Sequence, residues 1–151
     1  MRAVIQRVTH ATCRVDHKTT GAIESGLLVF LGFERDDSDE EQSWLIKKIL
    51  QLRVFEDDSG RMNHSISETG GGILLISQFT LLGSIQKGTR PSFNRAEDPA
   101  IAEARYHSTL DRLRAQHAGQ VASGKFAADM QIEAHNDGPV TLVIDSRRRD
   151  F

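Results

Sequence analysis

Apolar residues along the chain fall into short runs with the periods of β-strands. Residues 1–15 alternate between more and less apolar positions, which predicts a strand with one face toward a core. Residues 26–33 and 73–76 are continuously apolar and follow glycines. Unbroken apolar runs of this length are typical of strands covered on both faces. We therefore expect these two strands to lie deep in the sheet.

Two longer segments carry a helical period. The first opens with a capping-box pattern at residues 38–41, in which Ser38 can accept from the Glu41 N–H while the Glu41 carboxylate reaches back. Apolar residues at helical spacing then predict one buried stripe and a helix to about Leu52.

The second helix is expected to begin after Asp98, a favourable N-cap residue, with Pro99 in its first turn. Its apolar face comprises Ala102, Tyr106, Leu110 and Leu113. Gly119 is expected to end it.

Three further strands are predicted near the C-terminus, around residues 120–122, 130–134 and 140–144. Residues 136–139 (NDGP) are strong turn formers, and we expect them to join the last two strands. The pattern predicts an α/β fold with a mixed, largely antiparallel sheet and two main helices. It is expected to form a single domain over residues 1–151.

Composition narrows the class of protein. The formal net charge is −2 with a pI near 6.3, which lacks the basic footprint of a typical nucleic-acid-binding protein. The N-terminus does not resemble a signal peptide, and no apolar run approaches the roughly 20 residues that a membrane helix needs. The single cysteine, Cys13, fits a reducing compartment. We expect a soluble cytoplasmic protein that binds neither DNA nor membranes.

Positive charge does cluster locally. Lys87, Arg90 and Arg95 fall within one polar loop, residues 83–97. Such a cluster forms either a solvated face or a contact for phosphates, and both interpretations stay open.

A search for motifs with known chemistry is mostly negative. The six histidines form no metal-binding spacing, and we expect neither a metal nor a cofactor. The glycines at residues 70–72 precede a strand rather than a helix, which argues against a phosphate-binding loop. Ser77 lies in no nucleophile-elbow motif, although a triad assembled in space stays open.

Residues 77–80 (SQFT) are more promising, because they follow a buried strand at a place where loops collect. Strand alternation would put Ser77 and Phe79 on one face, and Gln78 and Thr80 on the other. The hydroxyl groups are suited to donating to a carbonyl or to weak nucleophilic attack. The alternative is that they only cap the strand end.

Gly138-Pro139 also has two interpretations. The pair can be an ordinary turn, or a stiff turn whose glycine carbonyl enters a pocket and rejects a substituent by contact.

Seven segments together resemble the D-aminoacyl-tRNA deacylase family, of the type called D-tyrosyl-tRNA deacylase. The resemblance extends over almost the whole chain. It is carried by residues 1–8 (MRAVIQRV), 26–29 (GLLV), 55–63 (FEDDSGRMN), 77–81 (SQFTL), 87–93 (KGTRPSF), 124–130 (GKFAADM) and 136–141 (NDGPVT).

The resemblance implies a homodimer that hydrolyses the ester bond of D-aminoacyl-tRNA and also acts on glycyl-tRNA. It implies that Gly138 and Pro139 are joined by a cis peptide bond and enter the partner subunit's active site, where they exclude L side chains. By the same resemblance, the catalytic pocket is lined by Ser77, Gln78, Phe79 and Thr80. Phe126 and Met130 would help to form the adenosine pocket.

The mechanism stays open at this point. The backbone N–H groups of Phe79 and Thr80 are candidates to stabilise an oxyanion, and Thr80 as a covalent nucleophile is the competing hypothesis. Two other functions also remain: an RNA-binding module without catalysis, and a general esterase with a spatial Ser or Thr triad.

Overall fold

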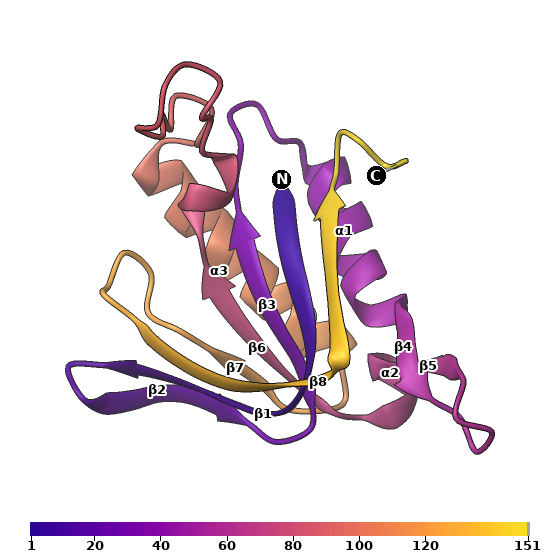
Figure 1. Cartoon of the computed structure of the whole chain (residues 1–151). Coiled ribbons are helices and arrows are strands. Elements are labelled where there is room, and N and C mark those ends of the chain that lie inside the picture. Colours follow the sequence, from indigo (N-terminus) through magenta and orange to yellow (C-terminus); the bar gives the residue numbers. More distant parts are fainter. Residues whose placement is uncertain (151) are drawn as a thin grey trace.

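A computed structural model describes residues 1–150; Phe151, the last residue of the expected domain 1–151, lies outside the described residues. The elements are β1 (Arg2–Val15), β2 (Lys18–Ile23), β3 (Gly26–Gly32), α1 (Asp39–Gln51), β4 (Arg53–Glu56), β5 (Met62–Ser65), α2 (Ile66–Thr69), β6 (Gly72–Ser77), the 3₁₀-helix η1 (Phe79–Leu82), α3 (Pro99–Gln116), β7 (Val121–Ser123) and β8 (Gln131–Asp145). The expected α/β fold with a mixed sheet and two main helices is confirmed (Figure 1).

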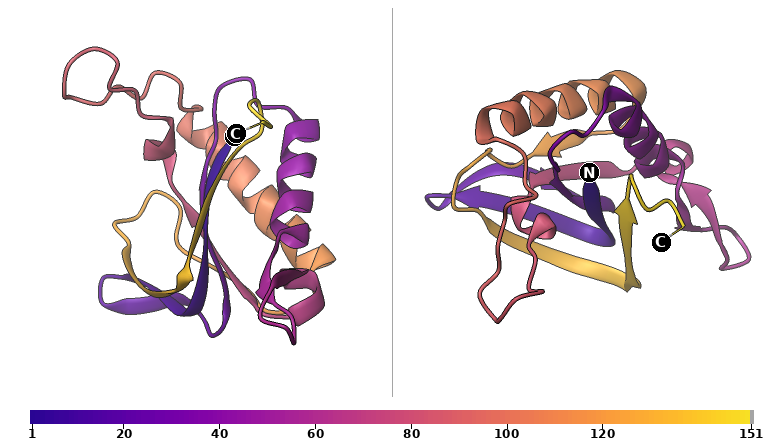
Figure 2. Two further views of the ribbon diagram at one scale, coloured as in Figure 1. Left: turned by 45° about the vertical axis from the view of Figure 1, so that its right-hand side comes forward. Right: turned by 90° about the horizontal axis from the view of Figure 1, so that it is seen from above.

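The main sheet has six strands in the order β2-β1-β3-β6-β7, with β8 paired to β1. β1 is antiparallel to β2, β3 and β8, whereas β3, β6 and β7 are parallel. The first half of β1 pairs with β3 and the second half with β2. The hairpin of β1 and β2 turns away from the upper part of the sheet (Figure 2). This bend lets the sheet cover part of its own face.

Two apolar cores lie on opposite faces of β3 and β6. α1 and α3 cover one face, where Ile5, Leu45 and Tyr106 belong to the larger core (Figure 2). The bent part of the sheet encloses the opposite face, where Leu28 and Leu74 are buried in the smaller core. The prediction that the runs in β3 and β6 are covered on both faces is therefore confirmed.

The helix boundaries follow the local signals closely. Ser38 and Glu41 form the expected capping box, and Asp98 caps α3. The expected end of α3 at Gly119 is wrong, because the helix stops at Gln116. Gly119 serves close packing instead, since a Cβ placed there would lie 2.5 Å from the Gly70 carbonyl oxygen.

The expected turn between two C-terminal strands is also wrong. Both segments belong to the continuous strand β8, because both pair with β1, through Val8 with Asn136 and Gln6 with Thr141. Residues 137–140 therefore bulge out of one strand instead of reversing the chain. Asn136 closes the bulge, since its Oδ1 accepts from the Val140 N–H at 3.1 Å.

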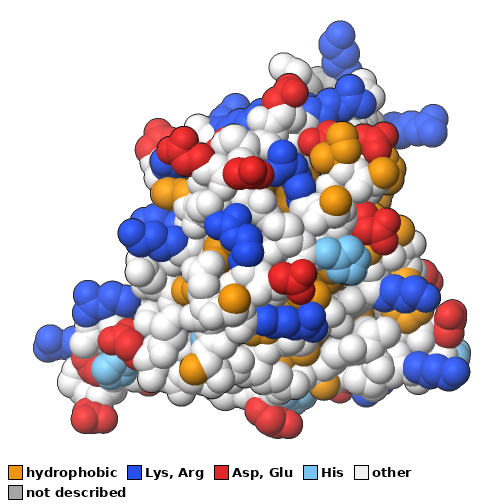
Figure 3. All heavy atoms as spheres, turned by 180° about the vertical axis from the view of Figure 1, so that it is seen from behind, with side chains coloured by type: hydrophobic (Ala, Val, Ile, Leu, Met, Phe, Trp, Pro, Cys, Tyr) orange, Lys and Arg blue, Asp and Glu red, His pale blue; other side chains and the backbone are white. Residues whose placement is uncertain are grey.

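Charged side chains of both signs are mixed over the face seen from behind in Figure 3, without one dominant sign. Within residues 1–150, no helix is both long and apolar enough to cross a membrane.

Candidate active site

A cavity of about 690 Å³ opens beside the C-terminal end of β6. It is bounded by the ends of β3 and β6, the segment before α3 and the segment before β8. Its lining includes Phe33, Ser77, Gln78, Phe79, Phe93, Ala102, Phe126, Met130 and Ile132. The lining is mostly apolar, with polar or charged side chains at Arg35, Ser77, Gln78, Glu97 and Asp98, an arrangement typical of small-molecule sites.

The segment 77–80 changes from strand to helix within the site. Ser77 is the last residue of β6, where it pairs with Leu31, and the Gln78 N–H donates to the Leu31 carbonyl at 2.7 Å. β3 ends one residue later, so β6 has no partner to continue along. Phe79 and Thr80 instead begin η1, and the expected strand alternation of these residues is wrong.

This change leaves backbone donors beside the cavity. The first hydrogen bond of η1 is donated by the Leu81 N–H to the Gln78 carbonyl at 3.3 Å. The N–H groups of Phe79 and Thr80 precede that bond, at the end of a helix where N–H groups have no intrahelical acceptor.

The residues of segment 77–80 line two adjacent hollows. Ser77, Gln78 and Phe79 line the main cavity. Thr80 lines a shallower hollow of about 330 Å³, which also includes Gln78. The Thr80 hydroxyl accepts a hydrogen bond from the Gln78 amide. Phe79 is 58% exposed and meets the edge of Phe93 at a centroid distance of 5.0 Å.

Phe126 and Met130 form the opposite wall of the cavity. The Phe126 ring lies 5.8 Å from that of Tyr106 in the core. Burial raises the pKa of the Tyr106 phenol to about 12, and its O–H donates to the Leu75 carbonyl at 2.8 Å. The wall is therefore supported from behind by a fixed side chain.

Gly138 and Pro139 lie apart from both hollows of this chain. They are exposed, and neither belongs to the lining of either one. The peptide bond between them is cis. The structure thus brings Ser77, Gln78 and Phe79 together with the Phe126 wall, but not with this pair.

Arg7 supports the bulge that carries them. Its guanidinium is 6% exposed and lies 2.9 Å from the Asp137 carboxylate. It also donates to the Val54 carbonyl at 2.6 Å.

Known proteins with similar sequences identify the family. The family model described as D-Tyr-tRNA(Tyr) deacylase matches residues 4–145. The chain belongs to this family.

Relatives of this deacylase family match at high identity. A D-aminoacyl-tRNA deacylase of Opitutus terrae is 55% identical over 99% of this chain and 100% of its own length. One from Anaeromyxobacter dehalogenans is 50% identical over 98% of this chain and 99% of its own. A solved structure titled c-Myc DNA Unwinding Element Binding Protein is 41% identical, with a TM-score of 0.91, and covers 96% of this chain and 98% of its own. The expected family resemblance is confirmed.

The structure adds residues to this candidate site that the sequence did not single out. Arg35 and Phe93 line the main cavity, and Arg7 holds the bulge. One signal was present for Arg7, because a charged residue follows Ala3 and Ile5 on the inward face of β1. Arg35 and Phe93 lie in loops, where no periodicity marks them.

No three His, Cys, Asp or Glu side chains within residues 1–150 are placed to hold a metal ion.

Proposed function

We propose that this protein hydrolyses the ester bond that joins a D-amino acid to the terminal adenosine of tRNA, and that it acts likewise on glycyl-tRNA. Free amino acid and tRNA are the products. Membership of the deacylase family supports the reaction class. The observation that carries the site assignment is the pair of backbone N–H groups at Phe79, which lines the apolar cavity, and at Thr80, which lines the adjoining hollow.

The cavity suits the adenosine. Phe126 and Met130 offer an aromatic ring and a polarisable thioether against a flat base, while Ser77 and Gln78 supply polar groups at the opposite wall. The aminoacyl group then lies near Gln78, which lines both hollows.

Hydrolysis at this place needs little from protein side chains, because an aminoacyl ester is already activated. A water oxygen attacks the ester carbonyl, the N–H groups of Phe79 and Thr80 stabilise the oxyanion, and the bond to the ribose oxygen breaks as that oxygen takes a proton. One such donor is worth about 3 to 4 kcal/mol. The neighbouring ribose hydroxyl assists the proton transfer.

The contacts of Thr80 favour this scheme over covalent catalysis. Its hydroxyl accepts from the Gln78 amide, which is no base, and no histidine of residues 1–150 is hydrogen-bonded to Ser77 or Thr80. A serine or threonine triad would require such a base.

A second copy of the chain completes the site in this proposal. Gly138 and Pro139 are exposed but line no hollow of their own chain, so they are available to a partner subunit. Val4 lies directly between Phe30 and Val143 on neighbouring strands, and Val143 is 39% exposed. This apolar row beside the Thr80 hollow is suited to a homodimer contact.

Chirality would be decided by the partner's rigid backbone. The partner's Gly138 and Pro139 would collide with an L side chain and leave room for a D side chain, while glycine has no side chain to exclude. Such a filter would serve proofreading in the cytoplasm, where aminoacyl-tRNA is used.

The test is a deacylation assay with purified protein on D-Tyr-tRNA, L-Tyr-tRNA and Gly-tRNA. We expect release of D-Tyr and glycine, with the L ester intact. Equal rates on the two enantiomers would discard the filter, and binding of tRNA without release would indicate an RNA-binding module. Inhibition by a serine-directed reagent, with cleavage of simple esters, would support the esterase alternative. The dimer is tested by sedimentation.

A further inference from the structure

We infer that residues 83–97 form an arm that contacts RNA, in which Lys87 and Arg90 bind the phosphate backbone of tRNA beyond its terminal nucleotide. This inference rests on the proposed function and extends it to the body of the tRNA. It assigns different roles to the cations of this loop.

The arm has a fixed base. Ser84 and Ser92 exchange backbone hydrogen bonds of 2.8 and 2.9 Å, which bring the two sides of the loop together. Phe93, on the returning side, lines the main cavity. Further along, the Arg35 N–H donates to the Arg95 carbonyl at 3.0 Å.

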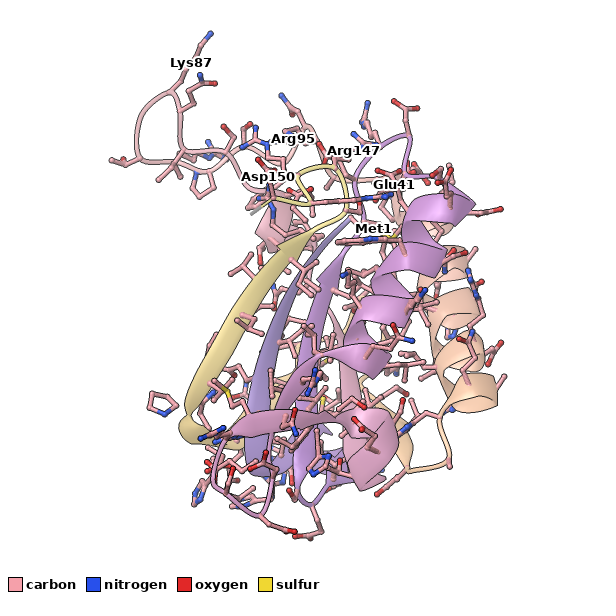
Figure 4. All side chains as sticks on the ribbon, turned by 90° about the vertical axis from the view of Figure 1, so that its right-hand side faces the viewer. Met1, Glu41, Lys87, Arg95, Arg147 and Asp150 are labelled. Carbon is pink, nitrogen blue, oxygen red and sulfur yellow. The ribbon has the colours of Figure 1, made fainter. Side chains whose placement is uncertain are left out.

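Arg95 belongs to the base and not to the contact surface. Its guanidinium lies 2.5 Å from the Glu34 carboxylate, which is only 7% exposed and is also contacted by Arg147. Figure 4 shows Arg95 near Arg147 at the foot of the loop, whereas Lys87 lies at the far end, away from the body. The ion pair therefore holds the base of the loop in place, and the charge of Arg95 is compensated by Glu34.

Lys87 and Arg90 keep their charges available. The arm carries one carboxylate, Glu97 at its base, and within residues 1–150 no carboxylate lies within 4.0 Å of Lys87 or Arg90. Both side chains are exposed.

The position of the arm is suited to contact a polyanion that extends out of the cavity. A terminal nucleotide held against Phe126 must continue into the next phosphates through the cavity mouth, and the arm rises from the cavity wall at Phe93. Because the whole protein has a net charge of −2, its attraction for RNA must come from local cations. Phosphate contacts by Lys and Arg supply such sequence-independent affinity.

The test compares wild type with a Lys87→Ala/Arg90→Ala double variant in binding uncharged tRNA at several salt concentrations. We expect the dissociation constant to rise about tenfold at low salt, and the slope of log affinity against log salt to become shallower by about 1.4 to 1.8. A Lys47→Ala/Arg114→Ala variant removes the same charges from exposed positions of α1 and α3. It should leave both quantities near those of wild type.

Turnover of D-Tyr-tRNA and of a D-tyrosyl ester of adenosine completes the test. The arm variant should raise KM only for the tRNA substrate, because the adenosine ester has no phosphate for the arm to contact. Unchanged tRNA binding, or equal losses in the two double variants, would overturn the inference. If wild type cleaves neither ester, the proposed function fails, while the binding measurements still decide on the arm.

Discussion

The Arg7 Nε atom lies 2.9 Å from the Asp137 carboxylate, so the first strand of the chain fixes the bulge near its other end. The same guanidinium donates to the Val54 carbonyl and lies 3.6 Å from Glu56. One nearly buried cation thus connects β1, β4 and the segment that carries Gly138.

Replacing Arg7 with Lys should loosen this bulge. Lysine keeps the charge but lacks the planar fork that reaches several acceptors at once. We expect a loss of about 2 kcal/mol in the free energy of unfolding, measured in urea, and an approximately tenfold loss of discrimination between D-Tyr-tRNA and L-Tyr-tRNA. The matched control is Arg14→Lys, because Arg14 also pairs across to β8, with Glu133, but at an exposed position. Similar effects in the two variants would show that Arg7 has no special role.

Gly138→Ala should damage activity more than stability. A Cβ at this position would lie 2.8 Å from the Val140 side chain, and the φ of +118° is unfavourable for alanine. We expect kcat/KM for D-Tyr-tRNA to fall by about 100-fold or more, with a stability loss of about 1 to 3 kcal/mol. Gly60→Ala is the control, because Gly60 has a φ of +76° but open space around its Cβ position. The Gly60→Ala variant should have an activity near that of wild type. Equal activity losses in the two variants would show that Gly138 has no role in the active site.

Thr80→Ala tests whether the threonine hydroxyl is the nucleophile. Because its described partner is an amide donor, we expect single-turnover deacylation to stay within about tenfold of wild type. Thr80→Ser, which keeps the hydroxyl, should differ little from the alanine variant. A loss of about 10⁴-fold or more in Thr80→Ala alone, with normal tRNA binding, would instead establish covalent catalysis.

Tyr106 offers a pH measurement, because it is the only tyrosine in the chain. Burial raises its pKa to about 12, so phenolate absorbance should appear near that pH in the folded protein, against about 10 after unfolding. Between these values the unfolded chain releases the proton while the folded chain keeps it, so the free energy of unfolding should fall as pH rises from about 10 to 12.

The variant Tyr106→Phe should remove this part of the alkaline decline. At pH 7 it should cost about 1 kcal/mol, since the Leu75 carbonyl loses the phenol but keeps the Gly124 N–H at 3.0 Å. A phenolate midpoint near 10 in the folded protein would contradict the buried environment.

The sequence alone determined the elements that depend on local signals. Ser38 with Glu41, and Asp98 with Pro99, marked the starts of α1 and α3, because capping and helical periodicity involve residues within a few positions of each other. The apolar runs of β3 and β6 indicated burial on both faces for the same reason. Family motifs pointed to Ser77 and Phe126, which the fold does place around one cavity.

Only the tertiary structure decided the features that depend on a distant partner. Residues 136–139 are strong turn formers, yet they form a bulge because β1 pairs with β8 on both sides of them. Phe79 leaves the strand because β3 ends beside it. Arg95 forms an ion pair with Glu34 instead of presenting its charge to solvent. Register and ion pairing are set by residues far apart in the chain, so no local pattern could specify them.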